Sequence, residues 1–234
     1  MQQTFEWMHR FNELVDRQKH DWVKWERELA NRLQVVSFST RIATLVNQTE
    51  EECSWDAYHA EYEALLPIME ATIPEGNQSS YDHSMVFTLA LVLLPAFHIV
   101  AWKCRWPRLR RRALDLLSRM PKWEWVYQTV QYHSIFSRIM EFEEKHLGLP
   151  PGDCPEEDWL PPEHERIQHF VISSRHASSA RPMMYEVTFI SRPHDVNGKI
   201  KCHSEMWELD SADAMKGALP INMMHPLSRL PLRP

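Results

Sequence analysis

Apolar residues recur every three or four positions through the first part of the chain, and charged residues fill the positions between them. The apolar positions between residues 4 and 46 are Phe5, Met8, Phe11, Val15, Trp22, Trp25, Leu29, Leu33 and Val36. This is the period of an amphipathic α-helix. The pattern predicts one long helix or two helices in tandem.

A second helical stripe follows after a short acidic stretch. Thr49 and Glu52 have the spacing of a capping box, in which the two side chains satisfy the first backbone N–H groups of a helix. The apolar positions after them are Tyr58, Tyr62, Leu65, Leu66 and Met69. Residues 72–80, TIPEGNQSS, have the composition of a loop. We expect one helix between these two boundaries.

Residues 85–102, MVFTLALVLLPAFHIVAW, are the most apolar part of the chain. The length is close to that of a membrane-spanning helix. Pro95 and His98 interrupt the stretch, and titratable residues flank it. A helix that is apolar on all sides is more often the buried centre of a helical domain. We therefore expect a buried helix and no membrane span.

A basic stretch follows at residues 103–117, KCRWPRLRRRALDLL. Pro107 suits the first turn of a helix, where its missing N–H costs nothing. The predicted buried stripe is Leu109, Ala113, Leu116, Leu117 and Met120. We expect Arg108, Arg110 and Arg111 to face away from that stripe. Arg112 flanks it, and its charged end is expected to reach a carboxylate.

The pattern changes in the last third of the chain. Residues 126–147 have a helical period, and Gly148 is well placed to end that helix. A proline-rich connector follows, after which alternating apolar and polar residues predict strands at 169–173, 184–191 and 199–209. Asn197-Gly198 is a typical hairpin turn between the last two strands.

These elements predict a mainly α-helical fold. About six helices form a bundle, and a small antiparallel β-meander follows at the C-terminal end. The whole chain, 1–234, is expected to be a single domain. Its parts are a helical core at 1–150, the connector at 151–168, the β-meander at 169–210 and a tail at 211–234.

Charge and cysteine content exclude several classes of function. The net charge is −6, so a general polyanion-binding role is not expected. A DNA-reading helix would carry Asn, Gln or Ser among its arginines, and the basic stretch does not. The four cysteines lie about 50 residues apart, without the close pairs of a zinc site. The charged N-terminus is not a secretory signal, so we expect an intracellular protein with free thiols and no bound metal.

The basic stretch and its surroundings resemble a known family. LVLLPAFHIVAWKCRWPRLRRRALDLLSRMPKWEWVY resembles part of the C-terminal regulatory domain of fungal binuclear-zinc-cluster transcription factors. EEECSWDAYHAEYEALLPIMEA before it, and IFSRIMEFEEKHLG and LPPEHERIQHFVIS after it, fit the same family. The resemblance spans about residues 35–210. It implies a helical domain that responds to small molecules or partners.

Two departures from the family pattern bear on function. The six clustered cysteines that bind two zinc ions in this family are absent, so direct nucleic-acid contact is not expected of this chain. The family usually has an acidic residue before the helix-starting proline, where it could cap the helix, and this chain has Trp106. Tryptophan cannot cap, so we expect Trp106 to pack or to contact a ligand.

The catalytic motifs of nucleotide-binding, α/β-hydrolase and zinc-protease enzymes are absent from the sequence. Two histidines in apolar surroundings, His98 and His133, are the candidate catalytic residues, since a histidine in an apolar cavity can move a proton. The aromatic and methionine-rich segments around them are candidate walls of an apolar pocket. The candidate ligand-binding residues are Phe97, Trp102, Trp106, Tyr132, Phe136 and Met140.

Three hypotheses follow. The first is a cofactor-free cyclase or isomerase of fungal secondary metabolism, acting on an apolar terpenoid or polyketide, and we favour it narrowly. The second is a ligand-sensing regulatory domain of a zinc-cluster transcription factor without its DNA-binding module. The third is a protein-interaction module whose exposed Met and Trp side chains bind a partner, a second copy of this chain included. The enzyme would be cytoplasmic, and the regulator would be nuclear.

Overall fold

The computed structural model describes residues 2–46, 51–73, 93–120, 123–124, 127–149, 153–156, 159–175, 184–191 and 200–208. Contacts along the chain divide it into two compact units, residues 1–163 and residues 164–234. The first unit holds the helices, and the second holds a three-stranded sheet. The expectation of one domain over 1–234, with the boundaries given above, stays a prediction.

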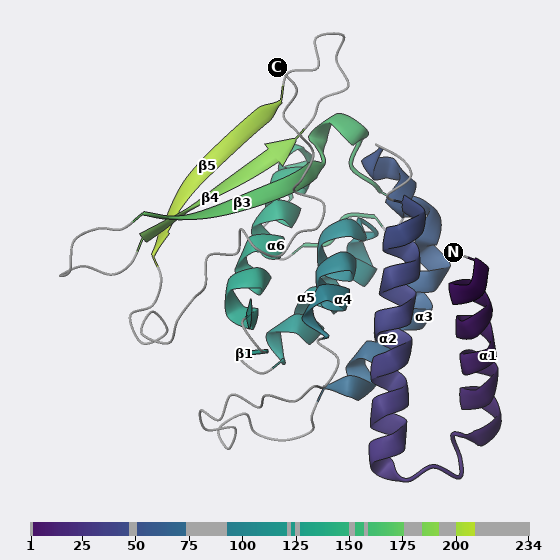
Figure 1. Cartoon of the computed structure of the whole chain (residues 1–234). Helices are drawn as coiled ribbons and strands as arrows, with labels where there is room; N and C mark the ends of the chain where they lie inside the picture. The colour runs from purple at the N-terminus through teal and green to yellow at the C-terminus, as the bar shows by residue number, and fades with distance from the viewer. Residues whose placement is uncertain are drawn as a thin grey trace. The chain divides into compact units, whose positions relative to one another are not determined.

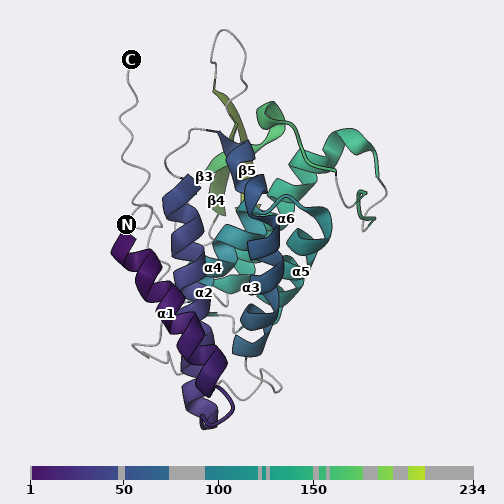
Figure 2. The same cartoon turned by 90° about the vertical axis from the view of Figure 1, so that its right-hand side faces the viewer.

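Two antiparallel helices open the helical unit. Helix α1 spans Gln2–Gln18 and α2 spans Lys24–Val46, and they lie side by side in both views (Figures 1 and 2). The sequence pattern predicts these helices but not the buried face of α2. Trp25, part of the predicted stripe, is 63% exposed. The buried residues of α2 are Ala30, Val35, Ser39, Ile42 and Val46.

The second helical segment begins with a turn of 3-10 helix, η1 (Glu52–Tyr58), and continues as α3 (His59–Thr72). Thr49 lies outside the described residues. The capping box therefore stays a prediction, and the Glu52 carboxylate accepts hydrogen bonds from Lys103 and Arg105. The carboxylate of Glu163 accepts the backbone N–H groups of Glu52 and Cys53 at 2.9 and 2.7 Å. A side chain distant in the sequence therefore caps this helix.

The apolar helix is described only from Leu93 onward, so its predicted start at 85 lies outside the described residues. It consists of α4 (Leu94–His98) and a π-helical turn, η3 (Ile99–Lys103). Helix α5 follows at Pro107–Ser118, with Pro107 in its first turn as predicted.

The last helix, α6, spans Thr129–Glu144 and is followed by a 3-10 turn, η4 (Lys145–Leu147). Its predicted start at 126 is wrong, because short strands β1 (Trp123–Glu124) and β2 (Tyr127–Gln128) pair just before it. Gly148 has φ +61°, a left-handed conformation that favours glycine, so the predicted helix end is confirmed.

The core of the helical unit joins side chains that are far apart in the sequence. Helix α3 contributes Tyr62, Leu65, Leu66 and Met69, and all four are fully buried. The other fully or almost fully buried apolar residues of α4 to α6 are Leu94, Ala96, Phe97, Val100, Ala101, Ala113, Leu116, Leu117, Ile135, Phe136 and Ile139. Burial of this apolar surface is the main force that stabilises the unit.

The second unit is an antiparallel meander in the order β3-β4-β5. The strands span Ile167–Arg175, Met184–Ser191 and Lys201–Glu208, close to the predicted ranges. Central strand β4 buries Tyr185, Val187 and Phe189 at alternate positions, which explains the two-residue period of the sequence. Asn197-Gly198 and the tail at 211–234 lie outside the described residues.

The predicted fold class is confirmed: six α-helices and a small antiparallel sheet occupy the described residues. Within those residues, none of the helices is long and apolar enough to cross a membrane.

Candidate functional site

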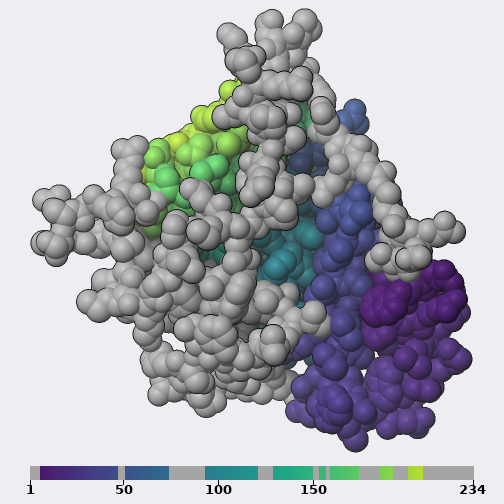
Figure 3. Space-filling model, in the orientation of Figure 1, coloured from purple at the N-terminus to yellow at the C-terminus, as the bar shows by residue number. Residues whose placement is uncertain are grey.

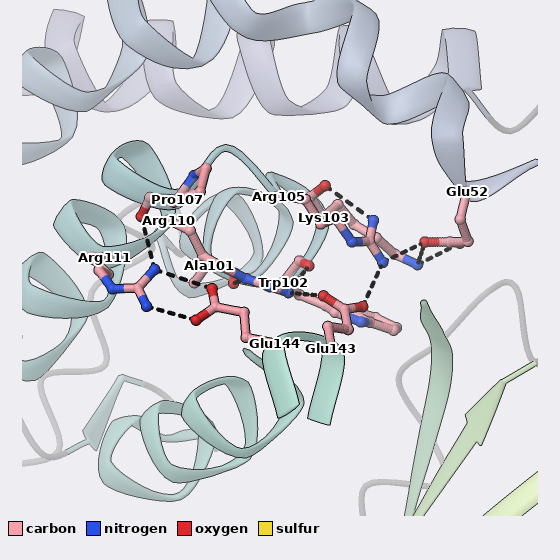
Figure 4. Close-up of polar contacts among 10 residues, drawn as sticks. All are labelled: Glu52, Ala101, Trp102, Lys103, Arg105, Pro107, Arg110, Arg111, Glu143 and Glu144. Carbon is pink, nitrogen blue, oxygen red and sulfur yellow. Dashed lines mark hydrogen bonds and ion pairs between the residues drawn. The ribbon is translucent and has the colours of Figure 1, made fainter. Parts of the chain in front are cut away.

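The residues that carry the family resemblance form a buried charge network. We use this name for Glu52, Lys103, Arg105, Arg110 and Glu143 (Figure 4). They come from η1, the end of η3, the turn before α5, α5 itself and α6. Arg105 and Arg110 are each 1% exposed, and Glu143 is fully buried. Charged side chains are almost never buried to this degree unless they are paired.

Glu52 and Glu143 are bridged by Arg105 (Figure 4). The Lys103 Nζ donates to both Glu52 oxygens at 2.7 and 2.9 Å. One terminal nitrogen of Arg105 lies 2.8 Å from Glu52 Oε2 and 3.3 Å from Glu143 Oε1. Arg110 pairs with the other Glu143 oxygen at 2.7 Å. The network is therefore a continuous chain from η1 through the core to α6.

Backbone carbonyl groups complete this network. Arg105 donates to the carbonyl oxygen of Lys103 at 3.0 Å. Arg110 donates to the carbonyl oxygens of Ala101 and Trp102 at 3.3 and 3.1 Å. Since these two carbonyls belong to the π-helical turn, Arg110 stabilises the end of the apolar helix as well as Glu143.

The ionisation of the network follows from its composition of three cations and two carboxylates. Burial raises the pKa of Glu52, but the charges of Lys103 and Arg105 outweigh it and hold that pKa below 4.5. Burial lowers the pKa of Lys103 to about 8, although Glu52 opposes the shift. Burial also disfavours the charge of Arg105, but two carboxylates raise its pKa above the ordinary value. Among these three residues, only Lys103 has its charged form disfavoured relative to water.

Aromatic rings surround the lysine end of the network, and a cysteine follows the lysine in the sequence. The Lys103 Nζ lies 3.9 Å from the centre of the Trp102 ring and 5.6 Å from that of Trp55, within cation–π range. Burial raises the pKa of the neighbouring Cys104 to about 12, so its thiol is uncharged at neutral pH. A thiol in that state is a poor nucleophile.

One of the arginines of α5 differs from the predicted arrangement. The expectation that Arg110 faces away is wrong, because Arg110 is buried. Arg111 makes a two-point pair with Glu144 at 3.0 and 2.6 Å, which is compatible with a side chain that points away from the apolar stripe. Arg108 is exposed, as predicted. The predicted carboxylate for Arg112 is confirmed as Glu70, at 3.1 Å.

Trp106 occupies the position before α5 and makes no capping hydrogen bond. Its indole Nε1 donates to the carbonyl oxygen of Asp56 at 3.3 Å. Its ring meets the His59 ring edge-on, with 4.5 Å between the centres. Trp106 therefore joins η1 and α3 to the start of α5. It shares no ring contact with Trp102, Tyr132 and Phe136, the predicted ligand-binding residues that pack around His98.

Four predicted site residues form an aromatic cluster. The His98 ring lies 5.1, 5.5 and 4.7 Å from the rings of Trp102, Tyr132 and Phe136. Trp102, Tyr132 and Phe136 are buried. Their contacts with one another are those of a packed core, and a role in ligand binding or catalysis stays a prediction.

The other three predicted site residues are more scattered. Phe97 is fully buried next to His98 in α4, and Met140 is partly exposed on α6. His133 is half-buried, and burial lowers its pKa against the opposing charge of Asp115. His133 makes none of the ring contacts that surround His98, so the structure does not bring the two candidate catalytic residues into one described cluster.

Sequence reasoning missed the two acids of the network. Glu143 follows Ile139 by four residues and Phe136 by seven, so it lies on the apolar face of α6. An acid on that face signals a buried partner. Glu52 carries no such signal, because it is the last of three consecutive glutamates and the sequence does not distinguish it from the other two. Among the described residues, no cluster of three or more His, Cys, Asp or Glu side chains could hold a metal ion.

Comparison with known proteins gives one informative similarity. The chain is 35% identical over 77 residues to the aspercryptin biosynthesis cluster-specific transcription regulator atnN of Emericella nidulans. The match covers 33% of this chain and 13% of that regulator, so the chain spans a small part of its relative. Neither a family model nor a solved structure matches the chain.

Proposed function

We propose that this chain is a regulatory domain that controls the expression of a fungal biosynthetic gene cluster, and that it acts in the nucleus. The similarity to the Emericella nidulans regulator carries this proposal. Under it, the chain responds to a small molecule or a partner and does not contact DNA itself. We also propose that the partner could be a second copy of this chain, which would form a homodimer.

The buried charge network supports the family resemblance on which the regulatory proposal draws, and the network by itself does not separate a regulator from an enzyme. The segment from Lys103 to Arg110, the most specific part of the family resemblance, builds the core of the domain. Residues that specify a core can be shared by proteins with a common scaffold. The cyclase hypothesis has no comparable support, because the aromatic residues on which it rests are packed against one another.

Transcript analysis in the source organism tests the proposal. The coding sequence is interrupted, and the transcripts of neighbouring biosynthetic genes are measured beside their metabolites. A regulator requires those transcripts to fall several-fold. Unchanged transcripts with accumulation of an unprocessed intermediate would instead identify an enzyme.

Complementation with a His133→Gln variant sharpens the result. His133 is half-buried, so this substitution should leave the fold intact. A regulator carrying it restores both transcripts and product. Restored transcripts without product would assign His133 a catalytic role and overturn the proposal.

A further inference from the structure

A groove of about 480 Å³ lies at the α1–α2 hairpin, apart from the buried charge network. Val15 of α1, Ala30 of α2 and Ile68 of α3 line it, so three helices contribute. In the space-filling view α1 and the first turns of α2 lie side by side at this hairpin (Figure 3). Its volume falls in the range of about 300–1,000 Å³ that is typical of small-molecule sites.

The inner wall of the groove is apolar. Val15 and Ala30 are buried, whereas Ile68 and Trp22 are half-buried. Aliphatic side chains and an indole ring offer a ligand little hydrogen bonding and a large apolar contact area. The matching part of a ligand is therefore an apolar body.

Exposed cations belong to the same groove. Lys19 Nζ lies 3.4 Å from Asp16, so its charge is partly matched. Arg27 donates one N–H to the carbonyl oxygen of Trp22 at 2.7 Å, and this contact fixes its position. In the described part of the chain Arg27 has no carboxylate partner. Its remaining N–H groups are free to form the parallel hydrogen bonds that suit a carboxylate.

The charges of the groove suit a singly charged acid. Lys19 and Arg27 supply two positive charges and Asp16 one negative charge, so these three residues sum to +1, which one carboxylate neutralises. We infer that the groove binds small carboxylic acids with an apolar body, the acid group at Arg27 and the body against Val15, Ala30 and Ile68. This inference rests on the proposed function for its biological meaning, as the signal to which the domain responds.

Calorimetric titration of the purified full chain tests binding independently of transcription. The probes are decanoate and 1-decanol, which share an apolar chain and differ in charge. Decanoate should bind at least tenfold more tightly than decanol, and its affinity should fall with added salt. Arg27→Gln should reduce decanoate affinity to that of decanol. Lys24→Gln removes the same charge from the same hairpin outside the groove, and should leave both affinities unchanged.

Arg27→Gln also removes the hydrogen bond from Arg27 to the carbonyl oxygen of Trp22, so a second variant that keeps this bond is needed. Asn31 lines the groove, so Asn31→Asp adds a negative charge there and should weaken decanoate binding without affecting decanol. Equal affinity for acid and alcohol, absence of saturable binding, or equal losses in Arg27→Gln and Lys24→Gln would overturn the inference. Binding with unchanged cluster transcripts would overturn the proposed function and leave this inference standing.

Discussion

The arginine-rich stretch supplies two charge clusters that differ in their exposure to water. Arg105 and Arg110 pair with buried carboxylates, whereas Arg112 and Arg119 pair with Glu70 on the surface. Distances are similar, 2.7 and 2.8 Å for the closest buried pairs and 2.6 and 3.1 Å for the surface pairs. Burial, and not contact geometry, therefore decides what each cluster contributes to stability.

Removal of Glu143 should have the largest effect on stability. Glu143→Ala leaves Arg110 and part of Arg105 without a carboxylate in a site that excludes water. Breaking a buried pair in this way costs about 3–5 kcal/mol. Urea denaturation should show a correspondingly lower midpoint, with a similar slope.

Glu141→Ala is the matched control, because Glu141 is an exposed acid on the same helix. Its midpoint should stay close to that of the unmodified chain. A double variant, Arg110→Met with Glu143→Leu, should lose less stability than the sum of the two single variants. Additive losses would show that the two residues do not act as a pair.

Because of Glu52, the free energy of unfolding should fall as the pH is lowered into the acid range. The pKa of Glu52 in the folded chain lies below 4.5, so its stabilising effect is present above that pH and is lost as pH falls through the folded value. Glu52→Gln should cost about 2–3 kcal/mol at neutral pH. Its stability should also vary less than that of the unmodified chain between pH 6 and 3, roughly the range in which a carboxyl group titrates. If the stability of both proteins changed equally with pH, Glu52 would not be the group responsible for the pH dependence.

Trp106→Asp should have a smaller net effect, because it has two opposing consequences. Aspartate would cap α5, and a good cap contributes about 0.5–2 kcal/mol. The variant loses the contacts of the indole with Asp56 and His59. We expect a change in the free energy of unfolding within about 1 kcal/mol. A loss beyond about 3 kcal/mol, the size of a core truncation, would show that packing outweighs the cap.

The surface cluster should give the smallest effect. Two arginines lower the pKa of Glu70 through hydrogen bonds from Arg119 and Arg112, but the carboxylate faces water. Glu70→Ala should lower the urea midpoint slightly at low salt and not measurably at high salt. A loss as large as that of Glu143→Ala, independent of salt, would remove the distinction between the two clusters.

The sequence predicted most of the elements because their patterns are local. Pro107 and Gly148 mark helix ends through their own backbone preferences, and β4 alternates apolar and polar residues over its whole length. Part of the aromatic cluster was also predictable, because His98 and Trp102 lie one turn apart in the chain. Trp106 and Met140 were grouped with them on residue type alone, which does not determine position.

The direction in which each charged side chain points was decided only by the tertiary structure. Arg108 and Arg110 are neighbours in one basic run, yet the first faces water and the second pairs with Glu143 in the core. Local sequence assigns both to a helix, because helix propensity and period depend on nearby residues. Whether an arginine is buried depends on a carboxylate brought to it by another helix, and α6 lies about thirty residues further along the chain. Only folding brings that partner close enough to balance the cost of removing both charges from water.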